Sequence, residues 1–150
     1  MTVVVVRTTI HGHHVDDTME VVHEYAPRCG LEVGQTVGVP GVHEIPVVTS
    51  ELLAKRDIEG VVALGVIVAG ASDHDQVLGF NVPKQLVELS CKYGKPVGIG
   101  IIGPGTSWED VERSTERYAK EAVDAVAEIG ETLDLLCAIR RRGVRLSIKS

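Results

Sequence analysis

The sequence predicts a single α/β domain over residues 1–150, with a four-stranded, mainly parallel sheet between two layers of helices. Short apolar runs alternate with longer amphipathic stretches along the chain, and this alternation is typical of βαβ units. The chain has 150 residues, of which 44% are hydrophobic, so it can bury a core of its own. The order of the elements therefore indicates a three-layer α/β/α architecture.

Two strands and two helices are expected in the first part of the chain. Val3–Val6 contains only valine, which favours a strand buried on both faces, and Leu31–Val39 is a second, weaker strand. Asp16–Arg28 is predicted to be a helix because apolar side chains recur on one of its faces. Glu44–Arg56 is predicted to be a helix entered through Pro46, since proline is tolerated in the first helical turn.

The central part of the chain adds two strands and a long helix. Val61–Val68 is apolar throughout, which indicates a central strand covered on both faces. Asp73–Tyr93 is predicted to be a helix in which Pro83 lies inside or marks a break. Pro96–Ile102 is the fourth strand, and its two glycines indicate that another part of the backbone approaches closely.

Two helices, Ser107–Ile129 and Thr132–Arg142, separated at Gly130, complete the predicted fold. Ser107 is expected to cap the first of them, with Asp110 at its third position. Apolar residues lie on more than one face of this helix, so we expect it to need a partner beyond its own sheet. That partner is a second copy of the chain or, in a monomer, the last helix.

Composition and charge argue against several classes of partner. The net charge is −6 and aromatic residues make up 3%, a composition unlike that of nucleic-acid-binding proteins. The longest apolar stretch, Val61–Ala71, is too short to cross a bilayer, and no signal peptide is recognised. Cys29, Cys91 and Cys137 are far apart and odd in number, as expected of free thiols in a reducing compartment, so we expect a cytoplasmic protein.

Open parallel sheets bind ligands at the carboxyl ends of their strands, which makes four loops candidates for a site. These loops are Arg7–His14, Val39–Pro46, Ala69–His74 and Gly103–Ser107. Backbone N–H groups after Gly70, together with the Ser72 hydroxyl, would hold a phosphate, and His74 would exchange a proton with a reacting group. In the alternative, Ser72 or Asp73 only caps the helix and His74 is a surface residue.

The other loops also allow a binding and a structural interpretation. Glu44 could accept hydrogen bonds from polyol hydroxyls or amino groups, or only favour the dipole of its own helix. His11, His13 and His14 could attract a transition metal, but adjacent histidines on a loop usually face solvent, so no metal site is predicted. Arg113 could bind a phosphate, or pair with a glutamate one turn away on its helix.

Taken together, the loops resemble the lumazine synthase family, and its archaeal branch most closely. The motifs that carry the resemblance are Val39-Pro-Gly-Val-His-Glu-Ile-Pro46, Ala63-Leu-Gly-Val-Ile-Val-Ala-Gly-Ala-Ser-Asp-His74, Lys95-Pro96-Val97, Gly100-Ile-Ile-Gly-Pro-Gly105 and Glu112-Arg113. The match covers about Val3–Ile129, and the separation of the first two motifs makes it specific. It implies the family's flavodoxin-like fold and a transferase of riboflavin biosynthesis. That enzyme would condense 5-amino-6-ribitylamino-uracil with 3,4-dihydroxy-2-butanone 4-phosphate to 6,7-dimethyl-8-ribityllumazine.

The resemblance also implies a role for each site residue. His74 would be the acid/base catalyst, and Gly70, Ala71 and Ser72 would hold the phosphate with Arg113 of a neighbouring subunit. The pyrimidine and ribityl pocket would be lined by Thr8, Val42, His43, Glu44, Val66, Ile67 and Val68, with Ile99 of the adjacent chain closing it. No metal or redox cofactor is required, because an amine nucleophile, proton transfer and a phosphate seat suffice. The partners would be the two small molecules and further copies of the chain, in a homopentamer or a shell built of pentamers.

Three departures from the family pattern leave alternatives open. One is Glu121, which stands where a basic residue is often found near the phosphate. Arg7-Thr8-Thr9 stands where family members place an aromatic residue that stacks on the pyrimidine, and His43 stands where an aromatic or apolar residue is common. The Thr8-Thr9 pair instead resembles the archaeal riboflavin synthase, a paralogue with the same fold that lacks the Gly70–His74 segment. A non-catalytic flavin- or lumazine-binding assembly protein on this scaffold is the second alternative.

Overall fold

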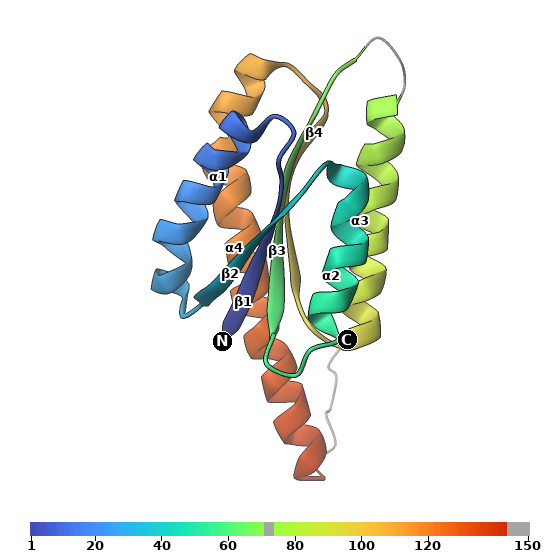
Figure 1. The fold of residues 1–150 in the computed structure, drawn as a ribbon. Coiled ribbons are helices and arrows are strands. Elements are labelled where there is room, and N and C mark those ends of the chain that lie inside the picture. Colours follow the sequence, from blue (N-terminus) through green and yellow to red (C-terminus); the bar gives the residue numbers. More distant parts are fainter. Residues whose placement is uncertain (71–73, 144–150) are drawn as a thin grey trace, which may run out of the picture.

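The computed structural model describes residues 1–70 and 74–143, which form one four-stranded sheet between two layers of helices (Figure 1). The strands are β1 (Thr2–Thr8), β2 (Glu32–Val39), β3 (Gly60–Val68) and β4 (Val97–Thr106). Neighbouring strands all run parallel, in the order β2-β1-β3-β4. The predicted α/β fold with a four-stranded parallel sheet is confirmed.

The helices lie in pairs on the two faces of the sheet (Figure 1). They are α1 (Gly12–Tyr25) and α4 (Trp108–Arg141) on one face, and α2 (Ile45–Leu53) and α3 (His74–Tyr93) on the other, with the short 3-10 helices η1 (Ala26–Cys29) and η2 (Val42–Glu44) beside them. The valine run of β1 explains this arrangement. Val3 and Val5 pack under α1 and α4, whereas Val4 and Val6 pack under α2 and α3, and all four are fully buried. Because successive side chains of a strand alternate between faces, such a strand needs helices on both sides.

Several element boundaries differ from the sequence prediction: α1 ends at Tyr25 and α2 at Leu53, each three residues early, and the largest differences before α4 are at the start of α1 and the end of β4. α1 begins at Gly12, so His14 lies in the helix and not in the predicted loop. The helix starts early because the His11 carbonyl accepts hydrogen bonds from the N–H groups of His14 and Val15. β4 continues to Thr106, through most of the segment predicted to be a loop, because the Ala69 N–H donates to the Thr106 carbonyl and so extends the pairing with β3.

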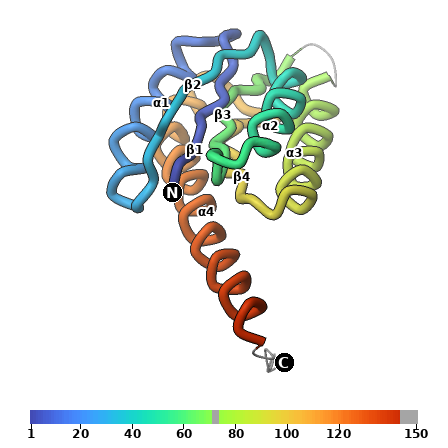
Figure 2. Tube along the Cα trace, turned by 60° about the horizontal axis from the view of Figure 1, so that its bottom comes forward, coloured from blue at the N-terminus to red at the C-terminus, as the bar shows by residue number. Residues whose placement is uncertain are grey.

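The prediction of a separate last helix over Thr132–Arg142 is wrong, because α4 runs without interruption for 34 residues. Gly130 lies inside it and is buried against Met1, where an added Cβ would be 2.6 Å from the Met1 Sδ. The missing side chain of Gly130 leaves room for Met1. A glycine inside a helix is less favourable than alanine by about 1 kcal/mol, which is too little to end a helix of this length. Figure 2 shows the C-terminal part of α4 extending away from the sheet, so it does not cover the rest of the helix as the monomer alternative requires.

Other details of the prediction are confirmed. Ser107 caps α4 and accepts a hydrogen bond from the Asp110 N–H at 3.2 Å. Pro83 lies within α3 and does not end it. None of the helices in residues 1–70 and 74–143 is long and apolar enough to cross a membrane.

Candidate active site

A pocket of about 360 Å³ lies where β1, β2 and β3 end, the place that the parallel topology predicts for a ligand site. It is lined by Ile10, His11, Gly41, Val42, His43, Val66, Ile67, Val68, Gly70, His74, Asp75 and Leu78. Most of these side chains are aliphatic or imidazole groups. Such a lining suits a flat, partly apolar ligand with a few polar atoms.

Backbone hydrogen bonds hold the loops around the pocket in place. The N–H groups of Thr9 and Ile10 donate to the carbonyls of Val39 and Pro40, at 2.8 and 3.2 Å, which keeps the end of β1 beside the end of β2. The Glu44 carboxylate accepts a hydrogen bond from the Gly41 N–H at 3.0 Å and so closes the turn that leads into α2. The two loops therefore contribute to one wall.

Two histidines face one another in this pocket. His43 comes from η2 and His74 is the first residue of α3, and their ring centroids are 5.7 Å apart with an interplanar angle of 51°. Both side chains are accessible to solvent. Imidazole is the side chain best suited to exchange protons near neutral pH, so the pair can supply a general acid and base to a bound ligand.

Comparison with known proteins identifies the family. Residues 1–134 match the family described as 6,7-dimethyl-8-ribityllumazine synthase. The chain belongs to the lumazine synthase family. The protein of that name from Staphylothermus marinus is 44% identical over 105 residues, which is 70% of each chain. Those of Pyrobaculum arsenaticum and Methanococcus aeolicus are 39% identical over 106 residues (71% of each chain) and 35% identical over 111 residues (74% of this chain and 81% of that protein).

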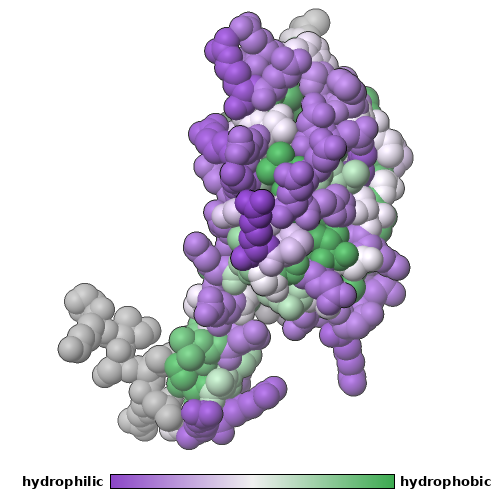
Figure 3. All heavy atoms as spheres, turned by 90° about the vertical axis from the view of Figure 1, so that its left-hand side faces the viewer, coloured by the Kyte–Doolittle hydropathy of each residue, from purple (hydrophilic) through white to green (hydrophobic). Residues whose placement is uncertain are grey.

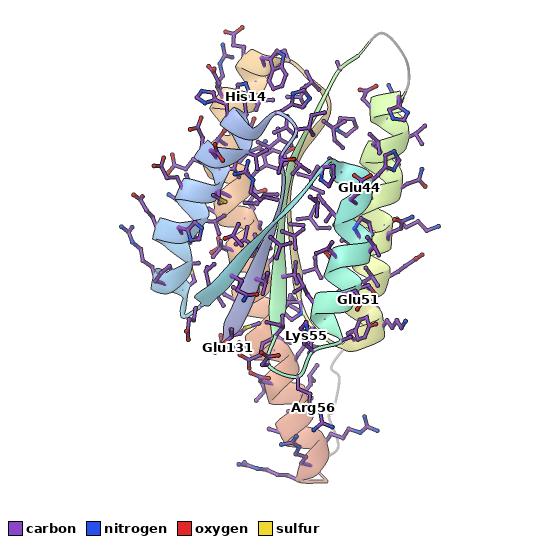
Figure 4. All side chains as sticks on the ribbon, in the orientation of Figure 1. His14, Glu44, Glu51, Lys55, Arg56 and Glu131 are labelled. Atoms are coloured by element: carbon purple, nitrogen blue, oxygen red, sulfur yellow. The ribbon has the colours of Figure 1, made fainter. Side chains whose placement is uncertain are left out.

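The structure brings together most of the residues that the family resemblance assigns to the pocket. Those that line it are Val42, His43, Val66, Ile67, Val68, Gly70 and His74. Thr8 does not line it: the side chain is fully buried beside Gly65, and its hydroxyl donates to the Ile10 carbonyl. Glu44 is not among the residues that line the pocket. Its carboxylate accepts the hydrogen bond from the Gly41 N–H, at the same end of the molecule as His14 (Figure 4). Ala71 and Ser72 lie outside the described residues.

Ile99 and Arg113 lie away from the pocket of their own chain. Ile99 is half-buried and packs against the core beneath α2 and α3. Arg113 is exposed on α4 and pairs with Glu109, one turn away, at 2.5 Å, as the structural alternative for this residue predicts. A contribution of either residue to the site therefore requires a second chain, and it stays a prediction.

Five residues that line the pocket are not among the site residues predicted from the sequence, namely Ile10, His11, Gly41, Asp75 and Leu78. Helical spacing after His74 could have indicated Leu78, since residues four apart share a helix face. Asp75 accepts a hydrogen bond from the Gly105 N–H at 3.3 Å, which ties α3 to the end of β4. Within residues 1–70 and 74–143, no three His, Cys, Asp or Glu side chains are arranged to hold a metal ion.

Proposed function

We propose that this protein is a lumazine synthase that condenses 5-amino-6-ribitylamino-uracil with 3,4-dihydroxy-2-butanone 4-phosphate to 6,7-dimethyl-8-ribityllumazine. One observation carries the proposal: the rings of His43 and His74, with centroids 5.7 Å apart, lie in a pocket at the ends of the strands. The chain that holds this pocket belongs to the lumazine synthase family. A volume of about 360 Å³ is within the usual range for sites that hold a small organic ligand. The relatives compared above all carry the lumazine synthase name, which favours this reaction over that of the archaeal riboflavin synthase.

The proposed mechanism needs only binding and proton transfer. The 5-amino group of the pyrimidine attacks the ketone of the four-carbon substrate and forms an imine with loss of water. A proton is removed from the adjacent carbon as phosphate is eliminated, and the resulting enol becomes a ketone. The ribityl-bearing amine attacks that ketone and closes the ring with loss of a second water. His74 would move the protons in these steps, because its ring lies at the pocket beside His43. Gly70 lines the pocket just before the start of α3, and the positive end of a helix dipole favours a phosphate there.

We further propose that the active form is a cytoplasmic homopentamer, or a shell of pentamers, in which Ile99 and Arg113 of one chain complete the site of the next. Large apolar side chains exposed in the single chain support an assembly, among them Phe80 on α3, with 72% of its surface accessible. Figure 3 shows further apolar side chains on the projecting end of α4, where Leu135 and Leu136 are exposed. Burying such residues against another chain would stabilise the assembly.

Steady-state formation of lumazine from the two substrates tests the proposal. We expect turnover by the wild type, and His74→Ala should lower kcat by roughly a hundredfold to ten-thousandfold, the usual contribution of a general acid or base. A wild-type protein that forms no lumazine at saturating substrate would refute the reaction. Light scattering on the same preparation tests the shared site, because an active monomer would contradict it.

A further inference from the structure

The C-terminal part of α4 projects beyond the rest of the domain. Gly130 is the last buried residue of this helix, and every residue over Glu131–Arg142 is exposed or half-buried. Figure 2 shows this part of the helix extending away from the sheet. The match to the family ends at residue 134, so most of the projecting part lies beyond it. Apolar side chains on such a segment need a partner outside their own domain to become buried.

Apolar side chains form a stripe along the projecting helix. Ile129, Leu135 and Leu136 are 47%, 61% and 41% exposed, and Figure 3 shows the apolar surface at this end of α4. The inner line of the stripe has gaps of three, four and three residues, through Ile129, Thr132, Leu136 and Ile139. This is the spacing with which two helices pack side by side in a coiled coil. The projecting helix is therefore suited to pair with another helix.

The charges along the projecting helix change sign from one end to the other. Three acidic residues precede the centre of the stripe and three basic residues follow it, namely Glu128, Glu131, Asp134, Arg140, Arg141 and Arg142. Two copies that pair antiparallel bring the acidic part of each helix level with the basic part of the other. A parallel pair would gather all the arginines at one end and all the carboxylates at the other, where like charges repel. Charge complementarity therefore favours the antiparallel arrangement.

One edge of the stripe indicates where two such helices would meet. Glu128, Leu135 and Arg142 are seven residues apart, so they lie in a row along the helix. In an antiparallel pair centred on Leu135, this leucine lies against its own copy, and Glu128 of each helix comes level with Arg142 of the other. Because the centre lies beyond Gly130, the two domains are at opposite ends of the pair and do not obstruct it.

We propose that the projecting end of α4 binds the same segment of a second copy of the chain, as an antiparallel pair with two-fold symmetry. A two-fold contact joins identical surfaces, whereas a ring of five joins two different surfaces of each chain. The pair would therefore link chains of two different rings, and it does not depend on the proposed reaction. It involves fewer side chains than the about 20–30 residues per partner of a standard interface. The pair is thus weak alone and is strengthened when an assembly presents several α4 ends at once.

Disulfide trapping in the full-length protein tests this contact. Cys91→Ser and Cys137→Ser first remove the two exposed thiols. In this background, Leu135→Cys should form a disulfide-linked dimer under mild oxidation about tenfold faster or more than Asp134→Cys, because the pair holds the two thiols close together. Asp134 is the matched control, since it is the exposed neighbour of Leu135 but lies on the face of the helix opposite the stripe. Circular dichroism checks that each variant folds.

Two further positions test the direction of the pair. A chain with both Glu128→Cys and Arg142→Cys should crosslink to a second chain, whereas each single variant should not, because only antiparallel pairing brings these two positions level. A dimer formed by Glu128→Cys alone would indicate a parallel pair and refute the proposal. If Leu135→Cys links no faster than Asp134→Cys, the stripe binds another protein or a surface and the inference is wrong. These readouts use gel mobility and not turnover, so a protein that crosslinks as expected but forms no lumazine refutes only the reaction.

Discussion

Replacing Gly98 by alanine should push α4 away from the sheet. Gly98 lies in β4 at the point where α4 packs on it, and an added Cβ would be 2.1 Å from the Ala122 carbonyl oxygen and 2.8 Å from its carbon. The first distance is more than an ångström short of ordinary van der Waals contact. Since these are backbone atoms of a helix, they cannot rotate away as a flexible side chain would, and the helix itself must move.

The loss of folding stability expected for Gly98→Ala follows from the side chains packed around its contact with α4. Ala119, Ala122, Val123 and Val126 are each no more than 2% exposed and pack in the core beneath α4. Overpacking a core of this kind costs typically 1–3 kcal/mol and occasionally more, and the clash with backbone puts Gly98→Ala at about 3 kcal/mol. For a chain of this length that corresponds to a fall in Tm of roughly 6–12 °C.

Circular dichroism during heating measures this effect, at one protein concentration, because assembly makes Tm depend on concentration. Gly34→Ala is the matched control: its added Cβ would lie 3.4 Å from the Thr2 Cγ2, an ordinary contact. We expect this variant to unfold within about 2 °C of the wild type, as surface substitutions usually do. If Gly98→Ala unfolds as late as Gly34→Ala, then α4 does not pack on β4 as described.

Three further outcomes are expected. Lys95→Met should lower the free energy of unfolding in urea by about 1.5–3 kcal/mol, because the ammonium donates to the carbonyls of Leu53 and Lys55 at the end of α2; an unchanged value would contradict this. The hydrogen bond to Asp124, with a smaller contribution from Cys29, raises the pKa of Tyr25, so folding stability from this group is present below about pH 10 and falls as pH rises above it. Urea unfolding at several alkaline pH values should show a smaller fall for Tyr25→Phe, and equal falls would refute the assignment. Arg113→Ala should raise the KM for the phosphate-bearing substrate about tenfold or more while the KM for the pyrimidine changes little, and the opposite pattern would exclude a phosphate role.

The sequence predicts well those features that depend on local pattern. The all-valine run of β1 needs helices on both faces, and the structure supplies them. The Ser107 cap is likewise local, since it joins residues three positions apart. The motif around His43 and the one ending in His74 follow β2 and β3, which lie on either side of β1, and the carboxyl ends of parallel strands lie at the same edge of a sheet, so their meeting at one pocket could be predicted.

Features that depend on distant contacts could not be predicted. Gly130 lies inside α4, where its missing side chain leaves room for Met1 from the other end of the chain, a contact that no local pattern shows. His11 looked like one of several histidines on a loop, since its left-handed backbone conformation, with a φ of 54°, and the contact of its ring with that of Trp108 arise only after folding. Whether Arg113 pairs with Glu109 or reaches a neighbouring site depends on a second chain, which no local pattern encodes.

We propose that lumazine forms in the pocket between His43 and His74 and that a second chain completes this site. A crystal structure of the protein with 6,7-dimethyl-8-ribityllumazine and inorganic phosphate tests it most directly. We expect the lumazine ring in this pocket beside His74, and the phosphate near Gly70 within hydrogen-bond distance of the Arg113 guanidinium of a neighbouring chain. A ligand bound elsewhere, or a phosphate with no arginine from a second chain near it, would contradict the claim.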